Sequence, residues 1–380
     1  MRPLYYQNNF TLGILGGGQL GRMLIQSGID LNISFSVLDP DANAPCSQLA
    51  PFQVGKLTDY DTVIQFGKTC DLITIEIENV NTKALAELEK RGKKVFPQPS
   101  IIELIQDKRL QKQFYLDNEI PTAEFILTEN KSDVMKLRSF LPAVNKLGKE
   151  GYDGRGVQIL RKDEDLENAF DAPGLLEKLI PFDKEIAIIV AKNENGDIVS
   201  YPAVEMEFHP EKNLVEYLFA PADLNEAIQQ KADQIARKVI ERLGLIGILA
   251  VEMFVTKEGE VLVNEVAPRP HNSGHHTIEA NETSQYEQHL RAILNQPLGS
   301  TRMHSPSIMV NLLGEDGFTG EAKYKGMEKV LAIGGVHVHL YGKKITKPFR
   351  KMGHVTIVDN DMESLRKKAN FVKDNLKVIA

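Results

Sequence analysis

Cysteine, long apolar runs and an excess of positive charge are all lacking in this sequence. The two cysteines, Cys46 and Cys70, are too few for a disulfide framework and lack the spacing of a metal site. We therefore expect a reducing compartment, the cytoplasm. No apolar run approaches the roughly 18 residues of a membrane span, and the first nine residues are too polar for a signal peptide. We expect no membrane partner and no processing.

The charge balance is mildly acidic, with 45 Lys and Arg against 52 Asp and Glu and a net charge of −7. Because a chain without a global positive field holds polyanions poorly, the composition argues against nucleic acid as a partner. The 380 residues are 42% hydrophobic and 26% charged, which is ordinary globular usage. A chain of this length indicates two or three domains.

The first hundred residues alternate between strand and helix patterns, as in an α/β domain. Apolar runs at Thr11–Leu15 and Ile33–Leu38 predict strands on either side of a helix. Two further runs, Leu72–Ile77 and Val95-Phe96, flank a charged helical stretch at Lys83–Arg91 and continue a parallel sheet. Two prolines in Pro97–Ser100 then interrupt both patterns. We expect a first domain at residues 1–100.

From about Ala143 the pattern changes to short strands with hairpin turns, which indicates an α+β region. It contains a long helix candidate at Asp223–Leu243 and a second at Ser284–Leu294. More strands follow, and a last helix is expected to begin after Asp361 as its cap. We expect a second domain at residues 101–305 and a small third domain at 306–380.

A first glycine-rich motif, Gly16-Gly17-Gly18-Gln19-Leu20-Gly21, follows a strand and opens a helix. Its backbone N–H groups are suited to a phosphate at the helix N-terminus. Asp39 ends the next strand, where dinucleotide folds place a ribose-binding acid, so a nicotinamide-dependent dehydrogenase is one alternative. A tight turn without a ligand is another.

A second glycine-rich loop, Gly151–Gly156, follows a strand that carries Lys146. Glycines permit close backbone approach, so the loop is suited to cover a triphosphate, with Lys146 and Arg155 supplying charge. A surface hairpin without a ligand is the alternative. The apolar run before Pro181 has two interpretations as well, a core strand or a connector that exposes its backbone to an adenine edge.

Two carboxylates, Glu252 and Glu265, are predicted to face each other across a hairpin. If Glu258-Gly259 is a two-residue turn, Phe254 lies opposite Val263 and Glu252 lies opposite Glu265. Like charges at that separation destabilise the sheet unless a cation lies between them. The pair suits Mg²⁺, with an amide oxygen from Asn264 beside it. The alternative is an edge pair splayed into solvent.

Two further segments are rich in cationic side chains. Residues 269–276 contain three histidines, but Pro270 and Gly274 break any helix that would align them for zinc, so Arg269 and His271 serve better as donors to an anion. Residues 343–354 crowd six basic side chains, which suits a sugar phosphate; a solvated surface is the alternative. Together these features favour an enzyme with ATP, a metal ion and a second phosphorylated substrate.

Four motifs closely resemble those of the 5-(carboxyamino)imidazole ribonucleotide synthases, ATP-grasp ligases of purine biosynthesis. They are Gly-Gly-Gly-Gln-Leu-Gly-Arg-Met (16–23), Gly-Tyr-Asp-Gly-Arg-Gly (151–156), Asn-Glu-Val-Ala-Pro-Arg-Pro-His-Asn-Ser-Gly-His (264–275) and Arg-Lys-Met-Gly-His (350–354). The likeness spans nearly the whole chain. It implies an ATP-grasp fold with an N-terminal Rossmann-like, pre-ATP-grasp parallel-sheet domain and a small β-rich C-terminal domain, α/β and α+β in class.

The resemblance also implies roles for individual residues. Those implied to bind ATP are Lys108, Lys146, Gly151, Tyr152, Asp153, Gly154, Arg155, Gly156, Glu177, Lys178, Leu179, Ile180, Glu185, His209, Asn264 and Glu265. Those implied to bind 5-aminoimidazole ribonucleotide are Gln19, Leu20, Glu76, Asn272, Lys343, Arg350 and Lys351. Glu252, Asn264 and Glu265 would hold Mg²⁺, with Mn²⁺ as an alternative. Some positions depart from the family pattern: Lys108 replaces a common arginine, and His276 replaces a frequent tryptophan.

The implied reaction joins bicarbonate to 5-aminoimidazole ribonucleotide, with carboxyphosphate as intermediate and ADP and phosphate as products, in a homodimer. Asp153, Arg269 and His271 are its expected catalytic residues, the first as acceptor of the amine proton and the others as stabilisers of the anion. Related ATP-grasp enzymes, a glycinamide ribonucleotide transformylase or a biotin carboxylase, remain alternatives that share the metal pair.

Overall fold

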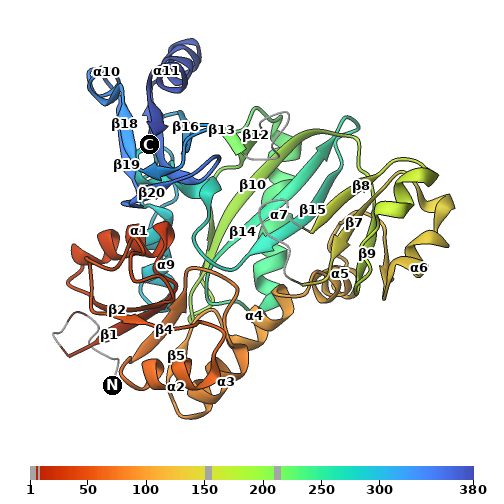
Figure 1. Cartoon of the computed structure of the whole chain (residues 1–380), viewed down its shortest axis with the longest axis horizontal. Helices are drawn as coiled ribbons and strands as arrows, with labels where there is room; N and C mark the ends of the chain where they lie inside the picture. Colours follow the sequence, from red (N-terminus) through yellow and green to blue (C-terminus); the bar gives the residue numbers. More distant parts are fainter. Residues whose placement is uncertain (1–5, 7–8, 150–155, 209–214) are drawn as a thin grey trace.

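Three main sheets and the helices between them make up the protein (Figure 1). The computed structural model describes residues 6, 9–149, 156–208 and 215–380. The chain passes through the sheets in order, first a parallel sheet, then a small antiparallel sheet and a large one that runs on into the C-terminal part. In the described part of the chain, no helix combines the length and apolar character that crossing a bilayer requires.

The N-terminal sheet is parallel and has the strand order β3-β2-β1-β4-β5. Its strands are β1 (Thr11–Leu15), β2 (Ser34–Asp39), β3 (Phe52–Val54), β4 (Leu72–Ile75) and β5 (Lys94–Val95). The alternation expected from the sequence is therefore confirmed. The sequence did not reveal β3, an edge strand of three residues with no buried side chain, because it has neither the length nor the apolar content of its neighbours.

Helices cover both faces of this sheet. They are α1 (Gln19–Ile29), α2 (Tyr60–Lys68), α3 (Thr82–Lys90) and, from the distant part of the chain, α9 (Gln285–Ile293). Leu24 of α1 and Leu290 of α9 belong to one buried cluster, whereas α2 and α3 share another on the opposite face. The apolar stripe predicted for α1 thus packs beneath a helix that begins more than 250 residues later, which ties the first and second parts together.

Two helices then lead into the next sheet, α4 (Pro99–Ile105) and α5 (Lys108–Asp117). Pro99, which the sequence suggested would stop regular structure, is instead the first residue of α4. A proline is tolerated there because the first turn of a helix leaves its N–H groups without partners in any case.

The small antiparallel sheet has the order β6-β9-β7-β8. Its strands are β6 (Phe125–Thr128), β7 (Ala143–Leu147), β8 (Val157–Leu160) and β9 (Gly174–Lys178), and it packs with α6 (Lys131–Met135) and the short helical turns η1 (Arg138–Phe140) and η2 (Asp163–Asn168). This sheet forms one wing of the molecule, drawn in yellow and olive in Figure 1. We refer to residues 125–178 as the β6–β9 wing.

The large sheet is antiparallel, with the order β15-β14-β10-β12-β13-β16-β21-β19 and β11 beside β10. Its strands are β10 (Phe182–Lys192), β11 (Ile198–Ser200), β12 (Val204–Phe208), β13 (Val215–Ala220), β14 (Gly247–Thr256), β15 (Val261–Ala267), β16 (Ser307–Leu313), β19 (Val336–Leu340) and β21 (Lys351–Val358). The helix α7 (Glu226–Leu243), predicted from the sequence, packs its apolar face on β10 and β14. The pairing of β13 with β16 carries the sheet across residue 305.

The C-terminal part adds short strands and two helices to the end of the large sheet. These are β17 (Gly320–Glu321), β18 (Lys323–Lys325), β20 (Ile345–Thr346), β22 (Lys377–Ile379), α10 (Met327–Leu331) and α11 (Met362–Asn375). Asp361 caps α11 by accepting the N–H of Ser364, as the sequence predicted. The short helices η3 (Asn272–Gly274) and α8 (Thr277–Ala280) follow β15 and precede α9 along the chain.

Candidate active site

The hairpin of β14 and β15 brings Glu252 opposite Glu265, which confirms the predicted pair. The predicted route to that pairing is wrong, because Phe254 lies opposite Leu262 and not Val263. The turn is one residue longer than expected, and a bulge between β14 residues 252 and 253 shifts the register back. Asn264 is the extra residue of the bulge, which places its amide beside Glu265 at the site itself.

A third carboxylate, Glu185 of β10, lies on the same face of the sheet. Ala187 is the partner of Glu252 across β10 and β14, and Glu185 is two residues from Ala187 on the same strand. Because side chains alternate along a strand, Glu185, Glu252 and Glu265 share one face. The opposite face of the sheet packs its apolar side chains against α7, so the polar side chains lie on this face. Burial, and next the charge of Glu265, raise the pKa of Glu185 to about 7.

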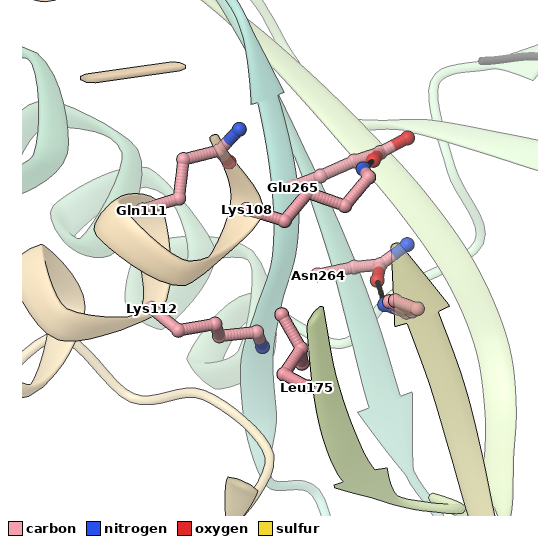
Figure 2. A pocket seen from close by; sticks show the side chains of 7 residues that line it. Lys108, Gln111, Lys112, Leu175, Asn264 and Glu265 are labelled. Atoms are coloured by element: carbon pink, nitrogen blue, oxygen red, sulfur yellow. Dashed lines mark hydrogen bonds and ion pairs between the residues drawn. The ribbon is translucent and has the colours of Figure 1, made fainter. Parts of the chain in front are cut away.

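The chain's own cations accompany the carboxylate pair. Lys108 of α5 forms an ion pair with Glu265 (Figure 2), and His271 Nε2 lies 3.4 Å from Glu252 Oε1. The charge of Lys108 is the main cause that lowers the pKa of Glu265, while burial and the charge of Glu265 raise the pKa of Glu252. From the sequence we expected that these carboxylates could coexist only with a metal ion beside them. In fact Lys108 already compensates Glu265, so the pairing alone does not demand a metal.

Lys146 of β7 reaches the same hairpin from the β6–β9 wing. Its Nζ lies 3.0 Å from Asn264 Oδ1 and 2.5 Å from Glu177 Oε2. Lys112 of α5 forms an ion pair with the other oxygen of Glu177. Lys112, Lys146 and Asn264 line a small cavity together with Lys108, Gln111, Leu175 and Glu265 (Figure 2).

Sequence reasoning missed Lys112. It follows Lys108 by four residues on one helix, and residues at that spacing lie on the same helix face. This spacing was the available signal, since Lys108 had already been assigned to the site.

The donor set on the hairpin suits a hard cation. Glu252 and Glu265 supply carboxylate oxygens and Asn264 an amide oxygen, which are the ligands that Mg²⁺ prefers. Among the described residues there is no group of three or more His, Cys, Asp or Glu placed to hold a metal ion. A Mg²⁺ ion held here would therefore take its further ligands from phosphate oxygens and water.

The segment expected to hold the adenine, Glu177–Ile180, is largely engaged within the chain. The Glu177 side chain is buried between two lysines. The backbone N–H of Lys178 donates to the Glu124 carbonyl, and that of Leu179 donates to the Pro142 carbonyl. Adenine contact by this segment stays a prediction that the Glu177 side chain, as placed, does not support.

The first glycine-rich turn does not present its N–H groups to a free phosphate. Glu76, at the end of β4, accepts the N–H groups of Gly18, Leu20 and Gly21 at 2.9, 3.1 and 3.0 Å. A carboxylate of the chain thus fills the anion position at the N-terminus of α1, and the expected phosphate contact is wrong for the structure as it stands.

Asp39 belongs to the same turn and is equally engaged. One oxygen accepts the Gly17 N–H at 2.7 Å and the other accepts the Asp41 N–H at 2.8 Å. A ribose-binding acid of a dehydrogenase needs free acceptors, so this geometry argues against that alternative.

Arg269 links this turn to the hairpin. Its Nε lies 2.8 Å from Glu78 Oε1, and its charge is among those that act on Glu76. Gln19 and Leu20 stand at the start of α1, and Asn272 begins η3 three residues after Arg269. Arg269 therefore links the turn that carries Glu76 to the segment that carries Asn272.

The basic segment of the C-terminal part lies against the N-terminal part. Lys344 Nζ donates to Asn43 Oδ1 at 2.8 Å, while Lys343 Nζ donates to the Lys351 carbonyl at 2.7 Å. Burial is the main cause that raises the pKa of Glu252, and the charge of Lys351 is among those that lower it. Arg350 donates to the Ile345 carbonyl at 2.6 Å, within its own loop.

The remaining histidines of the 269–276 segment turn inward. His275 accepts or donates at 3.0 Å with the Tyr286 hydroxyl, and its ring lies 4.6 Å from that of His354. Burial lowers the pKa of His276 to about 4. Gly156, the last residue of the second glycine-rich loop, accepts the Leu147 N–H and closes the base of that hairpin. The other implied loop residues, Gly151, Tyr152, Asp153, Gly154 and Arg155, lie outside the described residues, as does His209.

Three family models match the chain in succession. The ribonucleotide synthetase preATP-grasp domain matches residues 10–106 and the ATP-grasp domain residues 113–286. The phosphoribosylaminoimidazole carboxylase C-terminal domain matches residues 307–368. The ATP-grasp fold with its parallel-sheet N-terminal domain is thereby confirmed.

Curated relatives carry matching names. N5-carboxyaminoimidazole ribonucleotide synthases from Synechococcus elongatus and Bacillus subtilis are 38% and 37% identical, over 91% and 92% of this chain and 89% and 91% of theirs. The chloroplastic phosphoribosylaminoimidazole carboxylase of Vigna aconitifolia is 40% identical over 93% of this chain, which spans 65% of that longer protein.

Solved structures agree. The N5-carboxyaminoimidazole ribonucleotide synthetase of Thermotoga maritima has a TM-score of 0.90 at 43% identity and covers 98% of this chain and 99% of its own. The Aspergillus clavatus synthase, in complex with ADP and 5-aminoimidazole ribonucleotide, has a TM-score of 0.88 at 35% identity and covers 97% and 98%. The chain belongs to the N5-carboxyaminoimidazole ribonucleotide synthase family of ATP-grasp enzymes, the family that its motifs resemble.

Proposed function

We propose that this chain catalyses the ATP-dependent carboxylation of 5-aminoimidazole ribonucleotide with bicarbonate. The products are 5-(carboxyamino)imidazole ribonucleotide, ADP and phosphate, in purine biosynthesis. The observation that carries the proposal is the β14–β15 hairpin, where Glu252, Asn264 and Glu265 stand beside Lys108 and Lys146. The names of the bacterial relatives support it, as do the ADP and 5-aminoimidazole ribonucleotide bound to the Aspergillus clavatus synthase.

In this proposal the nucleotide phosphates lie between the hairpin and the β6–β9 wing. Lys108 and Lys146 approach them as point charges, and the second glycine-rich loop, residues 151–156, covers them. Glu252, Asn264 and Glu265 hold Mg²⁺, or Mn²⁺ in its place. When bound, the ion neutralises charge on the phosphate oxygens that flank the bond to be broken. Glu185 binds the ribose, and the backbone of Lys178–Ile180 the adenine.

The aminoimidazole ribonucleotide lies on the other side of the hairpin, where all three parts of the chain meet. Gln19, Leu20, Glu76 and Asn272 contact it from the first and second parts, and Lys343, Arg350 and Lys351 from the third. Because the anion position of α1 is filled by Glu76, the substrate phosphate pairs with the basic side chains instead. Glu76 then offers an acceptor to a hydroxyl or amine of the substrate.

The chain's residues act by positioning and charge. A bicarbonate oxygen attacks the γ-phosphorus in line, the bond to the β-γ bridging oxygen breaks, and carboxyphosphate and ADP result. Arg269 and His271 stabilise the anion that forms, since His271 lies beside Glu252 of the hairpin and Arg269, which is ion-paired with Glu78, precedes it by two residues in the same segment. The exocyclic amine then takes the carboxyl group, phosphate leaves, and Asp153 accepts the amine proton.

We extend the proposal to the organisation of the protein. The division into residues 1–100, 101–305 and 306–380 is supported by the three matched ranges, 10–106, 113–286 and 307–368. Assembly as a homodimer and a cytoplasmic location follow from the family resemblance and the scarcity of cysteine.

The test is release of ADP with and without 5-aminoimidazole ribonucleotide, in the presence of bicarbonate and Mg²⁺. The proposal expects release to depend on the aminoimidazole, together with incorporation of labelled bicarbonate into an acid-labile product. Glycinamide ribonucleotide with formate, and biotin, serve as competing acceptors. Stimulation by one of these in place of the aminoimidazole identifies the transformylase or the biotin carboxylase alternative and overturns the proposal.

A further inference from the structure

Lys112 is a buried lysine to which the reaction proposed above assigns no role. Its residue is 3% exposed, and its Nζ forms an ion pair with Glu177 and lies 2.5 Å from the Thr122 hydroxyl. Burial lowers the pKa of Lys112 to about 8, and the charge of Glu177 opposes that change. A buried ammonium is costly unless several partners compensate it, so a lysine kept here indicates a task.

The partners of Lys112 connect two sides of the nucleotide site. Glu177 of β9 divides its oxygens between Lys112 and Lys146, and Lys146 continues to the Asn264 amide at 3.0 Å. On the other side, the Thr122 hydroxyl donates to the Val263 carbonyl at 2.7 Å, one residue before Asn264. The chain of contacts therefore begins and ends on β15 and encloses the two lysines.

The charges of this circuit do not cancel. Two ammonium groups share one carboxylate, which leaves an excess of one positive charge in a region with little solvent. A carboxylate paired with Lys146 alone would neutralise that lysine and draw it toward β9. With Lys112 on its second oxygen, Glu177 is held in place and only partly neutralises Lys146, which donates to Glu177 and Asn264 and keeps its third N–H for a ligand.

We propose that Lys112 is a positioning residue of the nucleotide site, which acts through Glu177 to hold the Lys146 ammonium, charged and correctly placed, for the ATP phosphates. This inference rests on the proposed function only in that the site binds ATP. It does not depend on which molecule accepts the carboxyl group. The Lys112 ammonium is itself engaged by Glu177 and Thr122.

The test combines Lys112→Met with Lys146→Met in a double-mutant cycle. Binding of ADP is measured by calorimetry, and the KM values for ATP and for the acceptor are measured separately. Lys112→Met is expected to weaken ADP binding and raise the KM for ATP by about 10- to 100-fold, the worth of a charged hydrogen bond, while the KM for the acceptor stays unchanged. In the Lys146→Met background the same change should have little further effect.

Thr122→Val is the milder variant, because it keeps the charge of Lys112 and removes only one of its partners. It should weaken ADP binding a few-fold, and it keeps the test decisive if Lys112→Met does not fold. Lys136→Met, at an exposed lysine of the same wing, is the matched control and should change nothing. Additive effects of Lys112→Met and Lys146→Met, or equal rises in both KM values, overturn the inference. Failure of wild-type ADP release to respond to the aminoimidazole overturns the proposed function and leaves the binding cycle to be judged separately.

Discussion

Glu265 is subject to two opposing charges, because it faces the Glu252 carboxyl group across the hairpin and forms an ion pair with Lys108. The ammonium keeps it ionised, as the lowered pKa of Glu265 reflects. In the proposed function, binding of Mg²⁺ with ATP would require Lys108 to share or release this carboxylate. The phosphates can compensate the lysine at that point, so one ion pair is exchanged for another without leaving a buried charge alone.

Replacing Glu265 by glutamine tests that role. Glu265→Gln removes an anionic ligand and the partner of Lys108, so ADP release should fall by at least about 100-fold, the scale of a several-kcal/mol loss of charge stabilisation. The free energy of unfolding should change far less. Initial rates with saturating ATP and urea unfolding measure the two effects, with Glu258→Gln in the exposed turn as control. Turnover equal to the wild type would remove the metal assignment.

Glu185 gives a prediction for pH. Its pKa in the folded chain is about 7 against 4.5 for the ordinary side chain, so between these values the folded state binds more protons than the unfolded state. Stability therefore falls as pH rises from 4.5 to 7 and is constant with respect to this group above 7. Glu185→Gln, which stays neutral, should stabilise the ligand-free protein relative to wild type at pH 8, by at most about 3 kcal/mol, and not at pH 5.

Urea unfolding at the two pH values measures this difference. Equal effects of Glu185→Gln at pH 5 and pH 8 would contradict the burial of a neutral carboxyl group. The same variant should bind ATP more weakly if Glu185 contacts the ribose. The two measurements therefore separate the effect of Glu185 on the free energy of unfolding from its effect on ATP binding.

The sequence predicted those site residues that follow from strand pairing, and missed those that depend on packing between distant elements. Glu252 and Glu265 could be paired because a turn signal lies midway between them. Lys112 and Glu177 meet only because β9 packs against α5, and Glu78 meets Arg269 across two sheets. No local pattern encodes such contacts, so the ion pairs that organise the site were visible only in the structure.

At the scale of elements, the N-terminus of α1 is the clearest departure from expectation. The glycine pattern requires a backbone open to close approach, and what approaches is the Glu76 carboxylate. Gly18 has ordinary backbone angles, but a Cβ there would lie 2.5 Å from Glu76 Oε1. The glycine is thus explained by room for a side chain of the protein itself.

Gly18→Ala should displace Glu76 from α1. We expect a loss of about 1 to 3 kcal/mol in the free energy of unfolding, typical of an overpacked site, and a rise in the KM for the aminoimidazole but not for ATP. Gly334→Ala is the control, because a Cβ at that position meets no atom within 4 Å. An unchanged KM for the aminoimidazole would argue against Glu76 as a substrate-binding residue.

Several long elements of the fold were predictable from periodicity, namely α7, α9, α11 and the strands β1, β2 and β4 of the N-terminal sheet. Short elements were not. The helix α2 depends on its Asp59 cap, and β3 on its place at the sheet edge. The β14–β15 bulge was also hidden, since one extra residue in the turn and one in the strand compensate each other in any count along the sequence.

At the scale of the molecule, the β6–β9 wing is linked to the large sheet mainly by polar side chains. The wing contacts β15 through Lys146 and, by way of α5, through Lys112. Ligand binding between them should therefore tighten the wing. Hydrogen exchange followed by mass spectrometry should show slower exchange in residues 125–178 when ATP and Mg²⁺ are added, with β13 and β16 already protected in their absence. Equal slowing in both regions would contradict a mobile wing on a fixed sheet.

The pairing of β13 with β16 gives the C-terminal part a structural role, besides the substrate binding that we propose for it. A chain that ends after Ser305 would leave β13 as an exposed edge strand. Its unpaired N–H and C=O groups and the apolar side chains beside them could then pair with a second copy of the chain. We expect such a fragment to precipitate on expression rather than persist as a smaller working unit, which sedimentation of the lysate would reveal. Rearrangements of the domains in this family should therefore keep β13 and β16 together, because β16 of the C-terminal part covers the edge of β13.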